Sequence, residues 1–424
     1  MGSTKRVCDC DCIRMIRPNI LSLDKFRTER SETGHVPHTF LADLNENAMG
    51  PSLAPESMLW ACQEVAMPTA LFANDPWQER EAFSRYPDLN HVELKQAFCD
   101  FRNQRNGALE PLEPSNICVS SGLDDMIDLI VRCMCRPGQD RILICPPVYH
   151  MYQTSATIND IETVAIPLDS HNRFQLRLPE IQKTLRSDPS IKICFVCNPG
   201  NPTGFGIPVR DIQTLLDDPV WQGILVVDEA YIDFASTTQS VIGLVNRYPR
   251  LVVLQTLSKA FGLASIRVGF GVACAHLCAV LNNVKKPYSV SSQSIAVAKA
   301  ALTEQSLALL RVKLRSICEE RTRLARALGR IRGIAIRGGM DTNFVLFEVC
   351  RLGSASGEVS GRPCNVSAAG LVSLLRESAG ILVRFKGMEY GCEGCVRVSV
   401  GNGEENERFV EQVRLLMQFL ERAM

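Results

Sequence analysis

The sequence predicts an α/β fold in which a mostly parallel sheet is flanked by helices, with a smaller α+β domain toward the C-terminus. Three observations favour this fold. Apolar runs of strand length alternate with helical patterns over residues 53–310, which is typical of parallel sheets. Several of these runs end in turns with polar side chains, where open parallel sheets bind ligands. At 424 residues, the chain also exceeds the length at which a single core keeps growing.

The chain divides into three predicted parts. We expect an N-terminal arm at residues 1–52, a large domain at residues 53–310 and a small C-terminal domain at residues 311–424. Leucines at helical spacing from residue 307 onward predict a long helix that connects the two domains. In the small domain we expect strands at residues 344–347, 381–384 and 396–400. A Gly/Ser-rich insert precedes a helix that we expect Ser367 to cap.

Composition argues against several kinds of partner. The 46 acidic residues balance 46 lysines and arginines, which gives no reason to expect nucleic acid or an anionic membrane. No apolar run approaches the roughly 20 residues that cross a bilayer, and no apolar signal segment follows the first residues. The 18 cysteines are scattered, as in a cytoplasmic protein with reduced thiols. Cys8, Cys10 and Cys12 lack a second ligand cluster, so we predict an exposed arm and no metal site.

The region around Lys259 organises the chemistry. An apolar run at residues 251–254 predicts a buried strand, and Ser258, Lys259 and Arg267 follow it around a glycine-containing turn. A desolvated lysine near other cations has a depressed pKa, becomes a nucleophile and can hold an aldehyde cofactor as a Schiff base. Ser258 and Arg267 would then bind the phosphate of that cofactor. By itself, the pattern is equally compatible with a solvated loop after a strand.

Two further strands end in residues that suit the same cofactor. The apolar run at residues 224–227 ends in Asp228, at the carboxyl end of a predicted parallel strand. The ring nitrogen of pyridoxal phosphate needs such an acid, because a protonated ring withdraws electrons from the substrate. The strand at residues 193–197 runs into a turn rich in proline and glycine, which would aim Asn201 at the phenolic oxygen of the ring.

The strand and helix around Gly122 predict an anion site. Backbone donors of Gly122, Leu123 and Asp124, at the start of the following helix, would bind the cofactor phosphate. Tyr149 follows another strand and would stack on the cofactor ring. His150 either touches the substrate or is a partly exposed loop residue. No Walker loop or complete dinucleotide fingerprint occurs, so a nucleotide-binding reading loses its main support.

Short motifs in a fixed order carry a family resemblance. They lie at residues 44–47, 85–87, 145–147, 198–204, 228–231, 256–261 and 394–398. From about Leu41 to the C-terminus, the ordered set resembles the fold-type-I pyridoxal-phosphate aminotransferases, and more narrowly the histidinol-phosphate aminotransferase family of the fungal type.

The resemblance implies roles for further residues. Lys259 would be the general base, Asp228 would protonate the ring, and Tyr231 would join Asn201 at the phenolic oxygen. Arg397, Arg384 and Asn45 would bind an anionic substrate, although an arginine on an alternating strand such as that of Arg397 ordinarily lies on a solvated face. Tyr86 would reach the partner's cofactor phosphate in a homodimer; its alternative reading is an ordinary buried tyrosine.

The implied reaction exchanges an amino group between an anionic amine, with histidinol phosphate as the first candidate, and a 2-oxo acid such as 2-oxoglutarate, in histidine biosynthesis. A second reading is a diverged aminotransferase or pyridoxal-phosphate lyase that acts on another amino acid in specialised metabolism. It draws on residues unlike those expected in close relatives, namely Phe26, Leu123, His150, Ser265 and Asn402. A third reading, a scaffold without cofactor, conflicts with the set of Asp228, Lys259 and Arg267.

Overall fold

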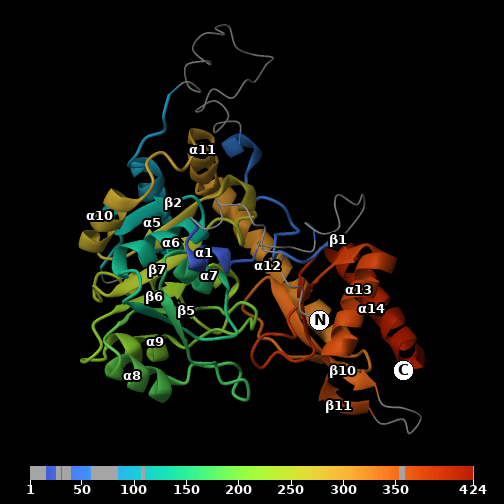
Figure 1. Cartoon of the computed structure of the whole chain (residues 1–424). Coiled ribbons are helices and arrows are strands. Elements are labelled where there is room, and N and C mark those ends of the chain that lie inside the picture. The colour runs from blue at the N-terminus through green and yellow to red at the C-terminus, as the bar shows by residue number, and fades with distance from the viewer. Residues whose placement is uncertain are drawn as a thin grey trace.

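The computed structural model describes residues 16–24, 30, 40–58, 85–106, 110–352 and 359–423. Phe26 and the cysteines Cys8, Cys10 and Cys12 therefore lie outside the described residues. Two sheets, each covered by helices, lie side by side in Figure 1, with helix α12 extending between them. The predicted α/β fold with a smaller C-terminal α+β part is confirmed.

The larger sheet has seven strands in the order β2-β8-β7-β6-β5-β3-β4. All neighbours are parallel except β8, which runs antiparallel to both β2 and β7. The strands are β2 Ile117–Ser120, β3 Arg141–Ile144, β4 Glu162–Ala165, β5 Ile191–Cys197, β6 Ile224–Asp228, β7 Leu251–Thr256 and β8 Gly269–Val272. The central strands β6 and β7 are almost wholly buried because helices cover both faces, as continuous apolar runs predict.

Alternate residues of the central strands point into two separate cores. Leu225 and Val227 of β6 belong to one core, and Val226 between them belongs to the other. The second core also contains Met126 and Ile130 of the helix that follows β2. The helices of this part are α5 Val92–Asn106, α6 Leu123–Met134, α7 Met151–Ile158, α8 Leu178–Ser187, α9 Val209–Leu216, α10 Ala275–Val284 and α11 Ser292–Ala301.

The smaller sheet is antiparallel, with the order β11-β10-β14-β13 and β9 paired to β10. Its strands are β9 Ile334–Ile336, β10 Phe344–Leu352, β11 Val359–Pro363, β13 Arg384–Phe385 and β14 Cys395–Ser399. Near it, β1 Phe40–Leu41 pairs in parallel with β12 Ile381–Leu382. The helices of this part are α12 Glu304–Leu328, α13 Asn365–Ala379 and α14 Gly403–Ala423. Since α12 is one continuous helix, residue 310 lies inside it.

Two details of the predicted small domain are wrong. The strand expected at residues 381–384 is divided into β12 and β13, which pair with different strands. Helix α13 begins at Asn365 with Cys364 at its N-cap, so Ser367 lies inside the first turn and not at the cap. Every residue of β14 is buried, Arg397 included, so this arginine does not lie on the solvated face that an alternating strand would ordinarily give it.

Short elements complete the description. They are helix α1 Pro18–Leu21 and the 3₁₀ turns η2 Pro114–Asn116, η3 Ile232–Phe234, η4 Ile242–Leu244 and η5 Ala264–Ile266. None of the helices in the described part of the chain combines the length and the apolar character needed to cross a bilayer.

Candidate active site

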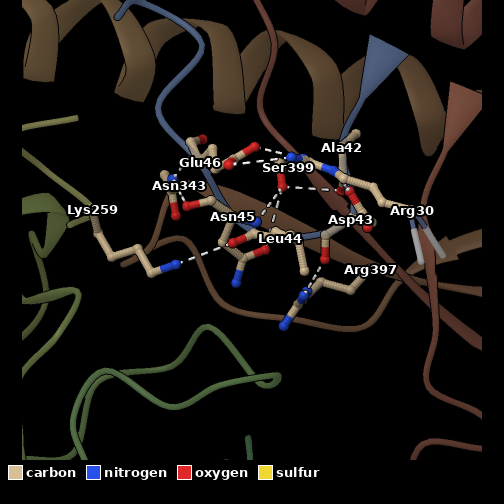
Figure 2. A network of polar contacts seen from close by, with 10 residues as sticks. All are labelled: Arg30, Ala42, Asp43, Leu44, Asn45, Glu46, Lys259, Asn343, Arg397 and Ser399. Atoms are coloured by element: carbon tan, nitrogen blue, oxygen red, sulfur yellow. Dashed lines mark hydrogen bonds and ion pairs between the residues drawn. The ribbon is translucent and has the colours of Figure 1, made fainter. Parts of the chain in front are cut away.

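A cavity of about 350 Å³ lies at the carboxyl ends of the central strands and between the two sheets. Nearly all of the predicted site residues line it: Asn45, Leu123, Asp124, Tyr149, Asn201, Asp228, Tyr231, Ser258, Lys259, Arg267, Arg384 and Arg397. The fold thus brings together residues that are more than 350 positions apart in the sequence, such as Asp43 and Arg397 in Figure 2.

Lys259 extends from the turn after β7 into this cavity. Its Nζ donates a hydrogen bond to the carbonyl oxygen of Leu44 at 3.0 Å, a contact visible in Figure 2. Burial lowers the pKa of Lys259 to about 8, and the nearby positive charge of Arg397 contributes to that shift. The amine is therefore partly neutral near physiological pH, the state in which a lysine is a nucleophile and a base.

Asp228 ends β6 beside Lys259 and is almost fully buried. The hydroxyl of Tyr152 donates to its Oδ2 at 2.6 Å, and the N–H of Ala230 donates to its Oδ1 at 3.0 Å. Burial raises the pKa of Asp228 to about 6, although both hydrogen bonds act in the opposite direction. Tyr152 was not among the residues predicted from the sequence. It lies three positions after Tyr149, and the two rings contact each other edge-on with centroids 5.9 Å apart.

The start of α6 forms a cradle with the shape and donors of a phosphate site. Gly122 is the N-cap residue with φ of 83°, and no side chain caps the helix, so the N–H groups of Leu123 and Asp124 lack intrahelical acceptors. A Cβ atom on Gly122 would lie 2.4 Å from Nη2 of Arg267. Ser258, held by Thr256 at 3.0 Å, lines the same cavity. Backbone donors, a hydroxyl and a guanidinium around a space that only glycine leaves open fit a phosphate group.

Tyr149 and Tyr231 lie on two sides of the cavity. The hydroxyl of Tyr149 donates to Oδ1 of Asp124 at 3.0 Å. The hydroxyl of Tyr231 accepts a hydrogen bond from Nδ2 of Asn45 at 2.9 Å. Burial raises the pKa of Tyr231 to about 12, so its proton is retained and available for donation.

Arg397 is a buried, pre-oriented guanidinium. Its Nη1 donates to Oδ1 of Asn201 at 2.6 Å and its Nη2 donates to the carbonyl oxygen of Asp43 at 2.7 Å. Both acceptors are neutral, which leaves the positive charge facing the cavity without a carboxylate at either nitrogen. An anion that enters the cavity would supply the missing negative charge.

Residues 42–46 bond both to Lys259, which follows β7 of the larger sheet, and to Arg397 on β14 of the smaller one, as Figure 2 shows. Ser399 and Asn343 bond the backbone of Asn45, and Arg30 pairs with the carboxylates of Asp43 and Glu46. In this segment, the carbonyl oxygen of Leu44 accepts a hydrogen bond from Lys259, and that of Asp43 accepts one from Arg397. The motif at residues 44–47 is recognisable in the sequence, but these carbonyl contacts are not, because no sequence pattern encodes which backbone groups accept hydrogen bonds from distant side chains.

The remaining residues of interest either line the cavity or lie outside it. Arg384, Lys386 and His150 line it, and His150 is exposed to solvent. Tyr86 is 80% exposed and stacks on Tyr288 with ring centroids 4.5 Å apart, so its reading as a buried tyrosine is wrong. Ser265 and Asn402 are not among the described residues that line the cavity.

Comparisons with known proteins agree on one class. The family described as aminotransferase class I and II matches residues 60–413. Histidinol-phosphate aminotransferase of Schizosaccharomyces pombe is 39% identical and that of Candida maltosa is 40% identical; the alignments cover 95% and 96% of this chain and 97% and 98% of those proteins. The crystal structure of histidinol-phosphate aminotransferase from Sinorhizobium meliloti in complex with pyridoxal-5'-phosphate superposes with a TM-score of 0.76 at 22% identity, over 96% of this chain and 98% of that one. At that identity, the structural likeness shows the fold alone.

Proposed function

Because this chain belongs to the class I and II aminotransferases and, within them, to the histidinol-phosphate aminotransferases, we propose that it exchanges an amino group between histidinol phosphate and a 2-oxo acid such as 2-oxoglutarate. This reaction is a step of histidine biosynthesis. The observation that carries the proposal is that one cavity holds a partly neutral lysine, a buried acid, a phosphate cradle and a buried arginine.

The cofactor of this enzyme is pyridoxal 5'-phosphate. When bound, it supplies an electron-withdrawing ring that stabilises negative charge on the substrate carbon. We assign its phosphate to the backbone donors of Gly122, Leu123 and Asp124 with Ser258 and Arg267, and its aldehyde to Lys259. Asp228 would face the ring nitrogen, Asn201 and Tyr231 the phenolic oxygen, and Tyr149 the ring face.

The residues of this chain also account for proton transfer and substrate binding. Lys259, as a free amine, moves a proton at the substrate α-carbon, a role that requires a pKa near the working pH. The carbonyl of Leu44 gives that free amine a defined position. Arg397, Arg384 and Asn45 bind the anionic groups of the substrates, and Arg397 is already oriented by Asn201 and Asp43. This orientation lowers the entropic cost of forming the complex.

The proposal is tested by mixing the purified, cofactor-loaded protein with histidinol phosphate and following the absorption spectrum of the cofactor. We expect a complete spectral conversion, reversed by 2-oxoglutarate with formation of glutamate. Histidinol without its phosphate is the matched control and should react far more slowly. The proposal is wrong if histidinol phosphate causes no conversion while another amino acid does, or if an amine is consumed without glutamate being formed. Either result would favour a diverged aminotransferase or pyridoxal-phosphate lyase that acts on another amino acid.

We also infer a homodimer in which Tyr86 completes the partner's site. The high exposure of its ring supports this, as does its stacking on Tyr288, which is itself 42% exposed. Two inactive variants, Tyr86→Ala and Lys259→Ala, provide the test. After mixing and subunit exchange, hybrid dimers contain one intact site, so activity should return. If activity stays absent although mass spectrometry shows hybrids, Tyr86 does not act across the interface.

A cytoplasmic location is part of the same proposal. It is supported by the cysteines in the described residues, all of which are free thiols. Fluorescence microscopy of a tagged chain would test it, and accumulation in an organelle would contradict it.

A further inference from the structure

Three cationic side chains share one face of the small sheet and point into the cavity. Arg384 on β13 lies directly opposite Arg397 on β14, and Lys386 follows two positions after Arg384. The N–H of Lys386 donates to the carbonyl of Cys395 at 2.8 Å, which continues the pairing of the two strands. All three residues line the cavity. Like charges on directly paired residues destabilise a sheet, so this arrangement suggests a function that depends on concentrated positive charge.

Lys386 is the least expected member of this group. Its side chain is only 15% exposed, and its Nζ makes a single hydrogen bond in the described structure, to Oε1 of Glu389 at 2.5 Å. An ammonium group has three donors, so two remain for a ligand. Burial and the neighbouring Arg397 lower the pKa of Lys386, which shows that the cations affect one another, while Glu389 opposes this shift. Glu389 therefore holds the ammonium in place and favours its charged form.

The two substrates of the proposed reaction differ in charge at this end of the cavity. A carboxylate of the 2-oxo acid carries one negative charge on two oxygens, whereas a phosphate monoester carries up to two charges on three oxygens near neutral pH. Arg384 and Arg397 together match a carboxylate, and a phosphate brings an additional oxygen and an additional charge. A compact ammonium with two unused donors suits that oxygen.

On this geometry, we propose that Lys386, positioned by Glu389, is a specificity-determining residue that contacts the phosphate of the amine substrate and does not contact the 2-oxo acid. The inference rests on the proposed function and deepens it. The alternative is a structural role in which the Lys386–Glu389 pair only stabilises the turn after β13. A structural pair would affect both substrates alike, whereas a phosphate contact would affect only one.

The test compares kcat/KM for the two substrates in Lys386→Gln, which retains a polar chain without the charge. We expect kcat/KM for histidinol phosphate to fall about 10- to 100-fold, as for loss of a charged hydrogen bond, and that for 2-oxoglutarate to change less than about 3-fold. Lys386→Arg, which keeps the positive charge, should retain most of the kcat/KM for histidinol phosphate. Glu389→Gln should give an intermediate loss, because the ammonium remains but is no longer held. Lys183→Gln, on the exposed surface of α8, is the matched control and should change neither substrate.

Calorimetric titration of the holoenzyme with inorganic phosphate provides a second measurement that needs no turnover. The wild type should bind phosphate more tightly than Lys386→Gln, by a similar factor. Equal losses for both substrates, no loss for either, or unchanged phosphate binding would each overturn the inference. If Lys386→Gln fails to fold, Glu389→Gln tests the same difference between the two substrates. If the wild type does not convert histidinol phosphate at all, the proposed function fails, and the phosphate titration still decides the role of Lys386.

Discussion

The hydroxyl of Tyr152 donates a hydrogen bond of 2.6 Å to Oδ2 of Asp228, inside the core of the larger sheet. Tyr152 is fully buried, and its ring stacks on Phe195 with centroids 4.6 Å apart. The packed ring fixes the hydroxyl, and the hydroxyl fixes the carboxyl group that we assign to the cofactor ring. Asp228 is thereby held by helix α7 and by strand β6.

Tyr152→Phe should therefore weaken cofactor binding without unfolding the protein. Loss of the hydrogen bond removes an interaction that lowers the pKa of Asp228, so this carboxyl should titrate at a higher pH in the variant. The pH at which affinity for pyridoxal phosphate declines on acidification should rise correspondingly. We expect an affinity loss of about 10-fold near pH 7. Tyr248→Phe is the matched control, since it removes an exposed hydroxyl bonded to Asp217 at 3.0 Å; an equal effect there would contradict this role.

Asp228→Asn should make the cofactor-free protein more stable and the loaded enzyme inactive. Burial raises the pKa of Asp228 from 3.8 to about 6, so its contribution to stability is fully present below pH 4 and is lost as the pH rises through 6. Above pH 6 the buried charge costs roughly 3 kcal/mol, which asparagine avoids. Urea unfolding at pH 5 and pH 8 measures this: the variant should gain free energy of unfolding chiefly at pH 8. A gain equal at both values would show that charge is not the cause.

Lys259 in the cofactor-free protein should titrate near pH 8 and not near the ordinary value of 10.5. Charged groups from several elements face it: Arg397 and Arg267 lower its pKa, while Glu46 and Asp124 raise it. Competitive acetylation with peptide mass spectrometry gives the midpoint, with exposed Lys183 as the internal reference. Glu46→Gln should move the midpoint of Lys259 below 8 and leave that of Lys183 unchanged. A wild-type midpoint near 10 would refute the depressed pKa.

Lys259→Ala should abolish transamination and keep the phosphate cradle. The general base and the covalent attachment are both lost, so kcat should fall by at least about 10³-fold. Equilibrium dialysis should still detect bound pyridoxal phosphate, and borohydride treatment should no longer fix it to the chain. Wild-type turnover by this variant would disprove the proposed mechanism.

Gly122→Ala should reduce affinity for the cofactor through two separable effects. Gly122 has φ of 83° and ψ of 171°, a backbone region essentially restricted to glycine that costs another residue about 1–3 kcal/mol, and the new Cβ would also displace the guanidinium of Arg267. Gly50→Ala is the control for the first effect, because Gly50 has φ of 71° and a Cβ added there would have no neighbouring atom within 4 Å. Both variants should lose stability to thermal unfolding, but only Gly122→Ala should lose cofactor affinity, by about 10-fold or more. Equal affinities would exclude the cradle role.

Local sequence patterns predicted the parts of the site that follow directly from strand ends. The apolar runs before Asp228 and Lys259 specify buried parallel strands, and such strands place their last residues at one edge of the sheet. The unpaired N-terminus of α6 after Gly122 was predictable for the same reason. Patterns failed where the outcome depended on partners: β12 and β13 separate because each pairs with a different strand, and Ser367 is not a cap because α13 begins at Asn365.

Sequence alone was enough to specify the α/β fold, because strand periodicity and turn residues act over a few positions. The ordered motifs, through the resemblance they carry, indicated the family and further residues that line the cavity. Three features are visible only in the folded structure. The carbonyl of Leu44 accepts a hydrogen bond from Lys259, and Asp43 and Asn201 accept hydrogen bonds from Arg397. Lys386 lines the cavity together with Arg384 and Arg397. The first two of these join segments that lie hundreds of positions apart. The first two exist because packing of the two sheets fixes distances that no local pattern encodes, and the third exists because β13 and β14 pair within the small sheet.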